Sequence, residues 1–336
     1  MDSWDILRNA WFLLVGVLLA GYSVLDGFDL GIGVLLPFLA GDGNERALLV
    51  RSIGPVWDGN EVWLLTGGGA LFAAFPHAYA TVFSGFYLAL MLVLFSLILR
   101  AVALEFRAHD PRRKRFWEAV FTGGSFLPAL LFGVALGNVV VGVPLDARME
   151  YAGTFFTLLR PLPLVFGLLG LAAFLLQGST WAALKTTGEL QARARRTAKI
   201  LAGVAMGAFF LSYLAVWAYL PGAVRKVPAW LFAVLVWVSL GLIPVALKKG
   251  KDGRAFFLSS VVFLGLWGTV GAVHYPNLVR AADPSLSLTI ANASSSALTL
   301  KVMLIIALLG MPLVVWYTIY AYRVFKGKVR PDGPGY

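Results

Sequence analysis

The strongest constraint in this sequence is a series of long apolar runs separated by short polar turns. Each run has roughly 20 residues or more, which is the length an α-helix needs to cross a bilayer. A transmembrane β-barrel would instead alternate apolar and polar residues in segments of about ten. The pattern predicts about nine transmembrane helices, at positions 10–39, 53–76, 78–100, 117–142, 161–183, 199–220, 228–247, 255–275 and 300–324.

The composition agrees with this class. Of the 336 residues, 59% are hydrophobic and only 13% are charged, which is too few to cover a soluble domain of this length. No polar connection is long enough for a soluble domain, so we expect residues 1–336 to form a single integral membrane domain with an all-α, polytopic fold. Residues 1–142 would form a first four-helix bundle and residues 143–275 a second. Residues 276–336 would add a peripheral last span and a cytoplasmic tail.

The distribution of charge predicts the orientation of the spans. The net charge is +11, and most of the 28 Lys and Arg residues follow the first, third, fifth and seventh runs or lie in the C-terminal tail. Because cytoplasmic loops are enriched in Lys and Arg, the N-terminus is expected outside and the C-terminus in the cytoplasm. The charge therefore needs no nucleic-acid partner to explain it. An acidic start, with Asp2 and Asp5, argues against a cleaved signal peptide.

Side chains that bind metals are scarce. The chain has no cysteine, so disulfides, thiolate metal sites and iron–sulfur clusters built on it are excluded. Among the histidines, His109 falls in a basic loop, whereas His77 and His274 are predicted at the outer ends of spans. Two histidines at matching depth can ligate one haem, although histidines at the membrane interface are the simpler interpretation. No metal site is predicted.

A first polar cluster interrupts the first apolar run. Asp26 and Asp29 are three residues apart and therefore share a helix face. Ionisable groups at membrane depth are costly and usually serve a function. At helical rise, Asp26 lies about 22 Å from Trp11, towards the cytoplasmic side. The alternative is that the span ends near Leu25, which would leave both acids in water.

A second polar cluster, with the sequence WDGNE at 57–61, opens the second apolar run. Pro55 suits the first turn of a helix, so Asp58 is placed near a helix N-terminus, on the same face as Glu61. One interpretation is that the helix dipole stabilises these acids. The other is that they transfer protons.

The predicted topology brings both clusters to the same depth. Asp26, Asp29, Asp58 and Glu61 would all lie in the cytoplasmic half of the membrane. Arg100, at the inner end of the third run, is their natural counter-charge. We expect these side chains to line a water-filled pathway for protons.

The motifs resemble those of one family. Residues 21–31 (GYSVLDGFDLG), 57–63 (WDGNEVW) and 67–76 (GGGALFAAFP) are similar to motifs of subunit II of the cytochrome bd-type quinol oxidases. Three further stretches fit, and the resemblance covers essentially the whole chain: 83–87 with Arg100, 124–126 to 137–138, and 287–295.

The resemblance implies a terminal oxidase of aerobic respiration with two or slightly more subunits, in a bacterial or archaeal cytoplasmic membrane. Such a complex oxidises quinol and reduces O2 to water. It takes the protons from the cytoplasm and generates a proton-motive force without pumping. Two b-type haems and one d-type haem belong to subunit I, so this chain is expected to ligate no cofactor and to be inactive alone.

The resemblance also implies roles for individual residues. Asp58 would serve a cytoplasmic proton path towards the haem d site, with Asp29 and Arg100 aligned near it. Trp57 and Asn60 complete the motif as structural partners. A quinone can occupy a hydrophobic groove of subunit II as a structural lipid, and small accessory subunits can join the complex.

A proton-coupled secondary transporter is the main alternative. Acids beside glycines in the inner half of the membrane, with two similar four-helix halves, would suit that class. A transporter would be stable and active without a partner chain, which separates the two hypotheses.

Overall fold

Helix α1 (Ser3–Leu39) is the central element of the protein. In the computed structural model, which describes residues 2–329, it packs against α3 (Trp57–Ala74), α6 (Lys114–Val141) and α7 (Pro161–Lys185). At 1.5 Å per residue α1 is about 55 Å long, whereas the hydrocarbon core of a bilayer is about 30 Å thick. It must therefore tilt or extend beyond the bilayer, as its predicted length suggested.

The helix does not end at Leu25. It continues for about four more turns, and Asp26 and Asp29 are both fully buried within it. The alternative that placed these two acids in water is therefore wrong. Their burial follows from the position of α1, which is covered on several sides by the other helices.

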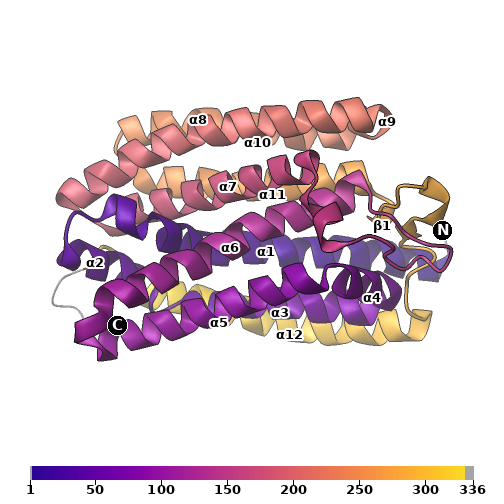
Figure 1. Cartoon of the computed structure of the whole chain (residues 1–336), viewed down its shortest axis with the longest axis horizontal. Coiled ribbons are helices and arrows are strands. Elements are labelled where there is room, and N and C mark those ends of the chain that lie inside the picture. Colours follow the sequence, from indigo (N-terminus) through magenta and orange to yellow (C-terminus); the bar gives the residue numbers. More distant parts are fainter. Residues whose placement is uncertain (1, 330–336) are drawn as a thin grey trace.

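The helices in the second and third apolar runs begin and end at other residues than predicted. A short helix, α2 (Gly43–Ile53), precedes α3 and lies at the end of the molecule where α1 finishes (Figure 1). The predicted span 78–100 is divided into α4 (Pro76–Gly85) and α5 (Tyr87–His109). Since α5 continues to His109, Arg100 lies inside the helix and not at its end.

The remaining elements are four long helices and short connecting elements. They are η1 (Pro111–Arg113), η2 (Phe155–Leu159), α8 (Gly188–Tyr219), α9 (Pro221–Val224), α10 (Val227–Lys248), α11 (Asp252–His274), β1 (Asn277–Val279), η3 (Pro284–Leu286), β2 (Leu288–Thr289) and α12 (Ala297–Val324). Helix α8 begins well before the predicted start at 199. Its first turns stay helical because Arg193 pairs with Glu45 and Arg195 pairs with Asp252, at 2.7 Å.

Eight helices among the described residues are long and apolar enough to cross a membrane. Helix α3, the second of the nine predicted spans, does not meet this criterion because its first turn carries Asp58, Asn60 and Glu61. It nevertheless lies lengthwise among the others (Figure 1). The all-α polytopic fold is confirmed, and α3 is its polar member.

The long helices pack as two groups that meet at α7. In the first group α1 packs on α3 and α6, and α5 packs on α6. In the second, α7 and α10 each pack on both α8 and α11. The two groups agree with the expected pair of four-helix bundles. The assignment of residues 1–142, 143–275 and 276–336 to separate parts stays a prediction.

The two groups come into close backbone contact where two glycines, Gly31 and Gly178, face each other. A Cβ atom built on Gly178 of α7 would lie 2.5 Å from the backbone carbon of Gly31 on α1 and 2.6 Å from the backbone nitrogen of Ile32. A Cβ on Gly31 would collide with the carbonyl oxygen of Phe174. These glycines therefore set the contact between α1 and α7, as small residues do between membrane helices.

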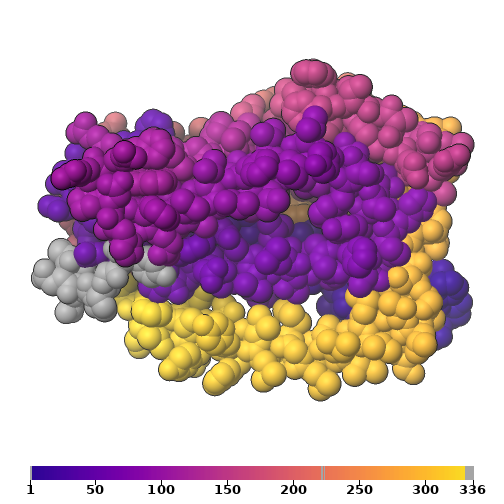
Figure 2. All heavy atoms as spheres, turned by 60° about the horizontal axis from the view of Figure 1, so that its bottom comes forward, coloured from indigo at the N-terminus to yellow at the C-terminus, as the bar shows by residue number. Residues whose placement is uncertain are grey.

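The last helix is peripheral, as expected. Helix α12 packs on α1 and α3, and of its residues only Leu300 is buried. Figure 2 shows it along one edge of the face that residues of α3 to α5 form. Most of its apolar surface is therefore available to lipid or to another chain.

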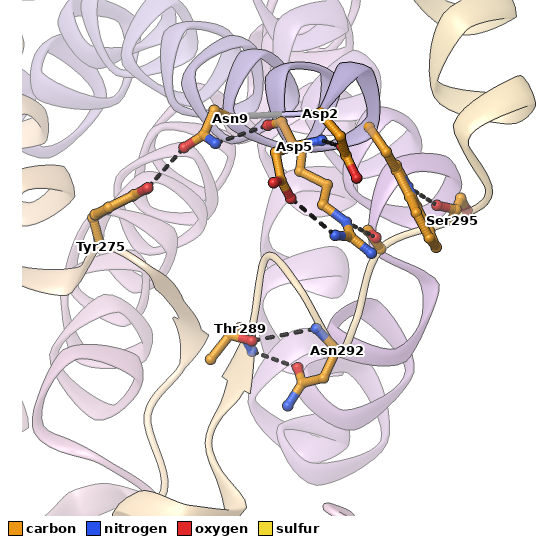
Figure 3. A network of polar contacts seen from close by, with 10 residues as sticks. Asp2, Asp5, Asn9, Tyr275, Thr289, Asn292 and Ser295 are labelled. Atoms are coloured by element: carbon orange, nitrogen blue, oxygen red, sulfur yellow. Dashed lines mark hydrogen bonds and ion pairs between the residues drawn. The ribbon is translucent and has the colours of Figure 1, made fainter.

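The loop before α12 is bound to the start of α1 (Figure 3). The indole of Trp4 donates to the carbonyl of Ser295 at 3.2 Å, and Tyr275 donates to Asn9 at 2.9 Å. Ser296 then caps α12 by accepting from the backbone of Thr299 at 3.2 Å.

Candidate functional site

Four helices bring polar side chains together inside the bundle. Helix α1 supplies two acids, α3 an amide and an acid, α5 an arginine and α12 a tyrosine. We call this group the acid–arginine cluster; it consists of Asp26, Asp29, Asn60, Glu61, Arg100 and Tyr322.

Arg100 joins three of these helices. Its guanidinium is fully buried, donates to Asp26 Oδ1 at 3.1 Å and also donates to Glu61 Oε1. Asp26 is fully buried, whereas the Glu61 side chain is 23% exposed. The cluster therefore reaches the surface of this chain through Glu61. The predicted pairing of Arg100 with the acids is present in the structure.

Asn60 connects the remaining members. Its amide nitrogen donates to the carbonyl of Leu25 at 3.1 Å and to Asp29 Oδ2 at 2.7 Å. Its amide oxygen accepts from the hydroxyl of Tyr322 at 3.0 Å. Through this one buried side chain, α3 contacts both the first and the last helix.

Two predicted residues lie outside the cluster. Asp58 is in the first turn of α3, as expected, but its side chain is exposed, and in the described part of the chain it makes none of the cluster's hydrogen bonds or ion pairs. Trp57 is buried in the apolar core that includes Leu49 and Ile53, and its indole nitrogen has no hydrogen-bond partner there. Asp58 thus stands at the surface beside the cluster, and Trp57 packs behind it.

Sequence reasoning missed Tyr322. Tyrosines near the ends of spans usually lie in the membrane interface, and position alone would place this one there. Its hydroxyl instead points inward to Asn60. No local pattern marks it, because the contact depends on how α12 crosses α3.

The exposed side chains of α3 and α5 are mostly apolar. Along α3 the exposed side chains include Val62, Leu65 and Phe72, and along α5 they include Leu92 and Phe95. Cβ atoms at Gly68 and Gly69 would meet nothing within 4 Å in the described part of the chain, so this side of α3 is open to close approach by another helix. We call this surface the α3–α5 face.

The tail after α12 is bound to the second group of helices. Lys185 Nζ donates to the carbonyl of Phe325 at 2.7 Å, and Lys328 Nζ donates to the carbonyl of Ala183 at 3.1 Å. The backbone of Val329 donates to the carbonyl of Lys185 at 2.8 Å. Burial lowers the pKa of Lys328 from its usual value. The tail therefore holds the end of α12 against α7.

Together, the fold and the cluster define a class: a polytopic helical membrane protein with a charged centre buried in its bundle. The chain matches the family model of cytochrome bd terminal oxidase subunit II over residues 7–325. It belongs to that family.

Individual relatives agree with this assignment. The chain is 37% identical to cytochrome bd-I ubiquinol oxidase subunit 2 of Escherichia coli K12, over 99% of this chain and 97% of the relative. It is also 37% identical to cytochrome bd ubiquinol oxidase subunit 2 of Bacillus subtilis, over 98% of each chain. The fold matches a chain of the bd oxidase from Geobacillus thermodenitrificans with a TM-score of 0.79 and 17% identity, covering 95% of this chain and 98% of that one.

Oxidases of this family contain haem, so we examined whether this chain offers a site for it. The described residues hold no group of three or more His, Cys, Asp and Glu side chains placed to bind a metal. A cavity of about 110 Å³ between α6, α7, α8 and α11 is lined by aromatic and aliphatic side chains, without histidine, cysteine or methionine. The side chains that most often ligate haem are thus missing from this cavity.

Proposed function

We propose that this chain is subunit II of a complex that oxidises quinol and reduces O2 to water in a bacterial or archaeal cytoplasmic membrane. Two relatives are named as subunits of ubiquinol oxidases, and the chain matches each over nearly its whole length. The complex would hold two b-type haems and one d-type haem in subunit I, with room for small accessory subunits. Following the charge bias, the N-terminus would lie outside and the C-terminus in the cytoplasm.

The first role of the chain would be to support subunit I. The α3–α5 face presents Asp58 and part of Glu61 within apolar surroundings. A carboxylate in contact with lipid at membrane depth costs several kcal/mol, of order 3. Contact with another protein chain would remove that cost by giving the acid a polar or hydrated partner. We therefore assign this face to subunit I.

The second role would be to supply protons. Asp58 lies at the surface, Glu61 is partly exposed, and Arg100 links Glu61 to the buried Asp26. This order, from an exposed acid to a buried one, is the observation that carries the proposal. Protons taken up from the cytoplasmic side for O2 reduction would make the reaction electrogenic without a pump. Asp58, Glu61, Asp26 and Asp29 would be the carriers, and Arg100 would hold two of them in place.

A quinone would find a place in the apolar cavity of the second group of helices. The hydroxyl of Tyr213, which lines this cavity, is buried without a hydrogen-bond partner among the described residues. A quinone carbonyl could accept from it while the ring packs against Phe132 or Trp267. In this role the quinone would be a structural lipid, because no redox partner lies beside it in this chain.

The proposal is tested first on the complex isolated through a tag on this chain. We expect haem bands in its reduced-minus-oxidised optical spectrum, none in the chain purified alone, and quinone in an organic extract of the complex. A colourless chain that is stable and transports a substrate without a partner would instead favour the secondary transporter. Haem bands in the isolated chain would favour the haem site between His77 and His274.

Replacing Asp58 tests the proton path. Asp58→Asn should slow O2 reduction by at least tenfold while leaving the haem content unchanged, because it removes a carrier and no haem ligand. The matched control is Glu189→Gln, which removes another exposed acid from the first turn of a helix, α8, in the second group. Equal turnover of the Asp58→Asn complex and the control across the pH range would contradict the role of Asp58.

A further inference from the structure

The acid–arginine cluster contains more acids than bases. Within the described residues it holds three carboxyl groups, those of Asp26, Asp29 and Glu61. Its one cationic side chain is that of Arg100, which pairs with Asp26 and Glu61. If all three acids were ionised, the cluster would bury a net charge of about −2, and uncompensated buried charges are so costly that such groups become neutral instead. At least one of the three carboxyl groups must therefore hold a proton.

The geometry shows which carboxyl group is in the poorest position to be charged. Arg100 donates to Asp26 and to Glu61, so each of these acids faces a cation directly. Asp29 receives only the neutral amide of Asn60, at 2.7 Å. Its other oxygen, Oδ1, is buried and has no hydrogen-bond partner in the described chain. Asp26 also leaves one oxygen without a partner, but its ion pair compensates the charge.

The orientation of Asn60 is determined independently of Asp29. The amide nitrogen also donates to the carbonyl of Leu25 on α1, and the amide oxygen accepts from the hydroxyl of Tyr322 on α12, so turning the amide would break both of these bonds. Asn60 therefore cannot turn to adapt to a change at Asp29. A single neutral hydrogen bond does not stabilise a fully buried carboxylate.

The other charged and titratable groups around Asp29 do not change this assignment. Asp26 on its own helix and Glu61 from α3 are acids that disfavour a further negative charge on Asp29. Tyr322 of α12 donates its hydroxyl to Asn60 and not to Asp29. Arg100 of α5 is the cation that acts on Asp29, and both of its recorded hydrogen bonds go to the other two acids.

We propose that Asp29 is a proton-binding site that is occupied at neutral pH, while Asp26 and Glu61 are the charged partners of Arg100. This inference deepens the proposed proton path and rests on it for where the proton goes. Asp29 would store a proton inside this path, one helical turn from Asp26. Asn60 connects Asp29 to Tyr322 of the last helix.

The test is infrared spectroscopy of the intact oxidase complex. A protonated carboxyl group has a carbonyl stretch that a carboxylate lacks. The spectrum of the wild type minus that of Asp29→Asn should contain this band, and labelling with carboxyl-13C aspartate, but not glutamate, should shift it. A difference spectrum without the band, or a band that moves with glutamate label, would overturn the proposal.

Stability gives a second, independent readout. Asparagine has the shape of a neutral aspartic acid, so the Asp29→Asn complex should assemble and melt at the temperature of the wild type. Asp26→Asn, the matched change one turn earlier, removes a partner of Arg100 and should lower the melting temperature. Failure of Asp29→Asn to assemble, or a loss equal to that of Asp26→Asn, would show that Asp29 is charged. If the band is present but Asp29→Asn turns over normally, the site exists and its place in the proton path is refuted.

Discussion

At the scale of single residues, Arg100 organises the centre of the protein. It is fully buried and its planar fork reaches two acids on different helices. A buried ion pair of this kind adds little net stability compared with apolar side chains, but removing one partner leaves an uncompensated charge. Its value to the fold is therefore that it fixes α1, α3 and α5 relative to one another.

Substitution of Arg100 should show this directly. Arg100→Met should destabilise the complex by about 3–5 kcal/mol, because Asp26 and Glu61 lose their cation in a buried site. Arg100→Lys should lose less, since a lysine keeps the charge but cannot bond to two acids through a rigid fork. Thermal melting of the purified complex measures both. An exposed arginine, Arg112→Met, is the control, and equal effects of Arg112→Met and Arg100→Met would contradict the argument.

At the scale of elements, the contact between α1 and α7 depends on the absence of side chains. Gly31 and Gly178 let two backbones meet where any Cβ atom would be too close. Packing of this kind replaces the hydrophobic effect as a source of helix association in a membrane. The buried acids of α1 benefit, since a helix held tightly on the α7 side keeps Asp26 and Asp29 away from lipid.

Gly178→Ala should therefore lower the melting temperature of the complex, because its Cβ would meet backbone atoms that cannot move without separating α1 from α7. The matched control is Gly203→Ala in α8, where a Cβ would meet nothing within 4 Å. That change should be neutral or stabilise by up to about 1 kcal/mol, since alanine favours the helix over glycine. A control variant that loses as much stability as Gly178→Ala would refute the role of the close contact.

The sequence predicts the long elements well and their ends poorly. Apolar length is a strong signal, so α7, α10 and α11 lie close to their predicted spans and α8 ends where predicted, although it begins earlier. The ends shift where charged residues pair with a partner from elsewhere: Arg107 of α5 bonds to Glu118 at 2.9 Å, and both helices continue beyond the predicted spans. Such pairs depend on tertiary structure, which a run of hydropathy values does not contain.

The candidate site follows the same rule. Asp26, Glu61 and Arg100 could be grouped from their depth alone, because unlike charges inside a membrane need one another. The exposure of Asp58 and the burial of Asn60 could not be predicted, since both depend on which side of α3 faces α1. Tyr322 follows Asn60 by 262 positions, so no local spacing in the sequence connects the two residues.

At the scale of the whole molecule, the tail beyond α12 joins the last helix to the second group. Its contacts with α7 are hydrogen bonds from Lys185, Lys328 and Val329. These bonds connect α7 to the tail, and the tail continues from α12, whose Tyr322 is bonded to Asn60 of the acid–arginine cluster. Loss of the tail should therefore weaken the hydrogen bond between Tyr322 and Asn60.

Lys328→Ala should increase hydrogen exchange in the last two turns of α12 about fivefold, which corresponds to one hydrogen bond of ~1 kcal/mol. Lys326→Ala, an exposed lysine two positions earlier, should leave it unchanged. Because burial lowers the pKa of Lys328, the bound tail holds fewer protons than the free tail between the two pKa values. Its binding should thus strengthen as pH rises through that window. Identical exchange in both variants would show that the tail does not hold α12.

The bond between Tyr322 and Asn60 also has a consequence for biogenesis. Ribosomes make α3 long before α12, so during much of synthesis the amide oxygen of Asn60 lacks its donor, the hydroxyl of Tyr322. Only a chain translated through α12 can complete the polar centre that α1 began. A truncated product, however well inserted, would keep an unsatisfied group at its core, which gives membrane proteases a physical basis for telling finished chains from unfinished ones.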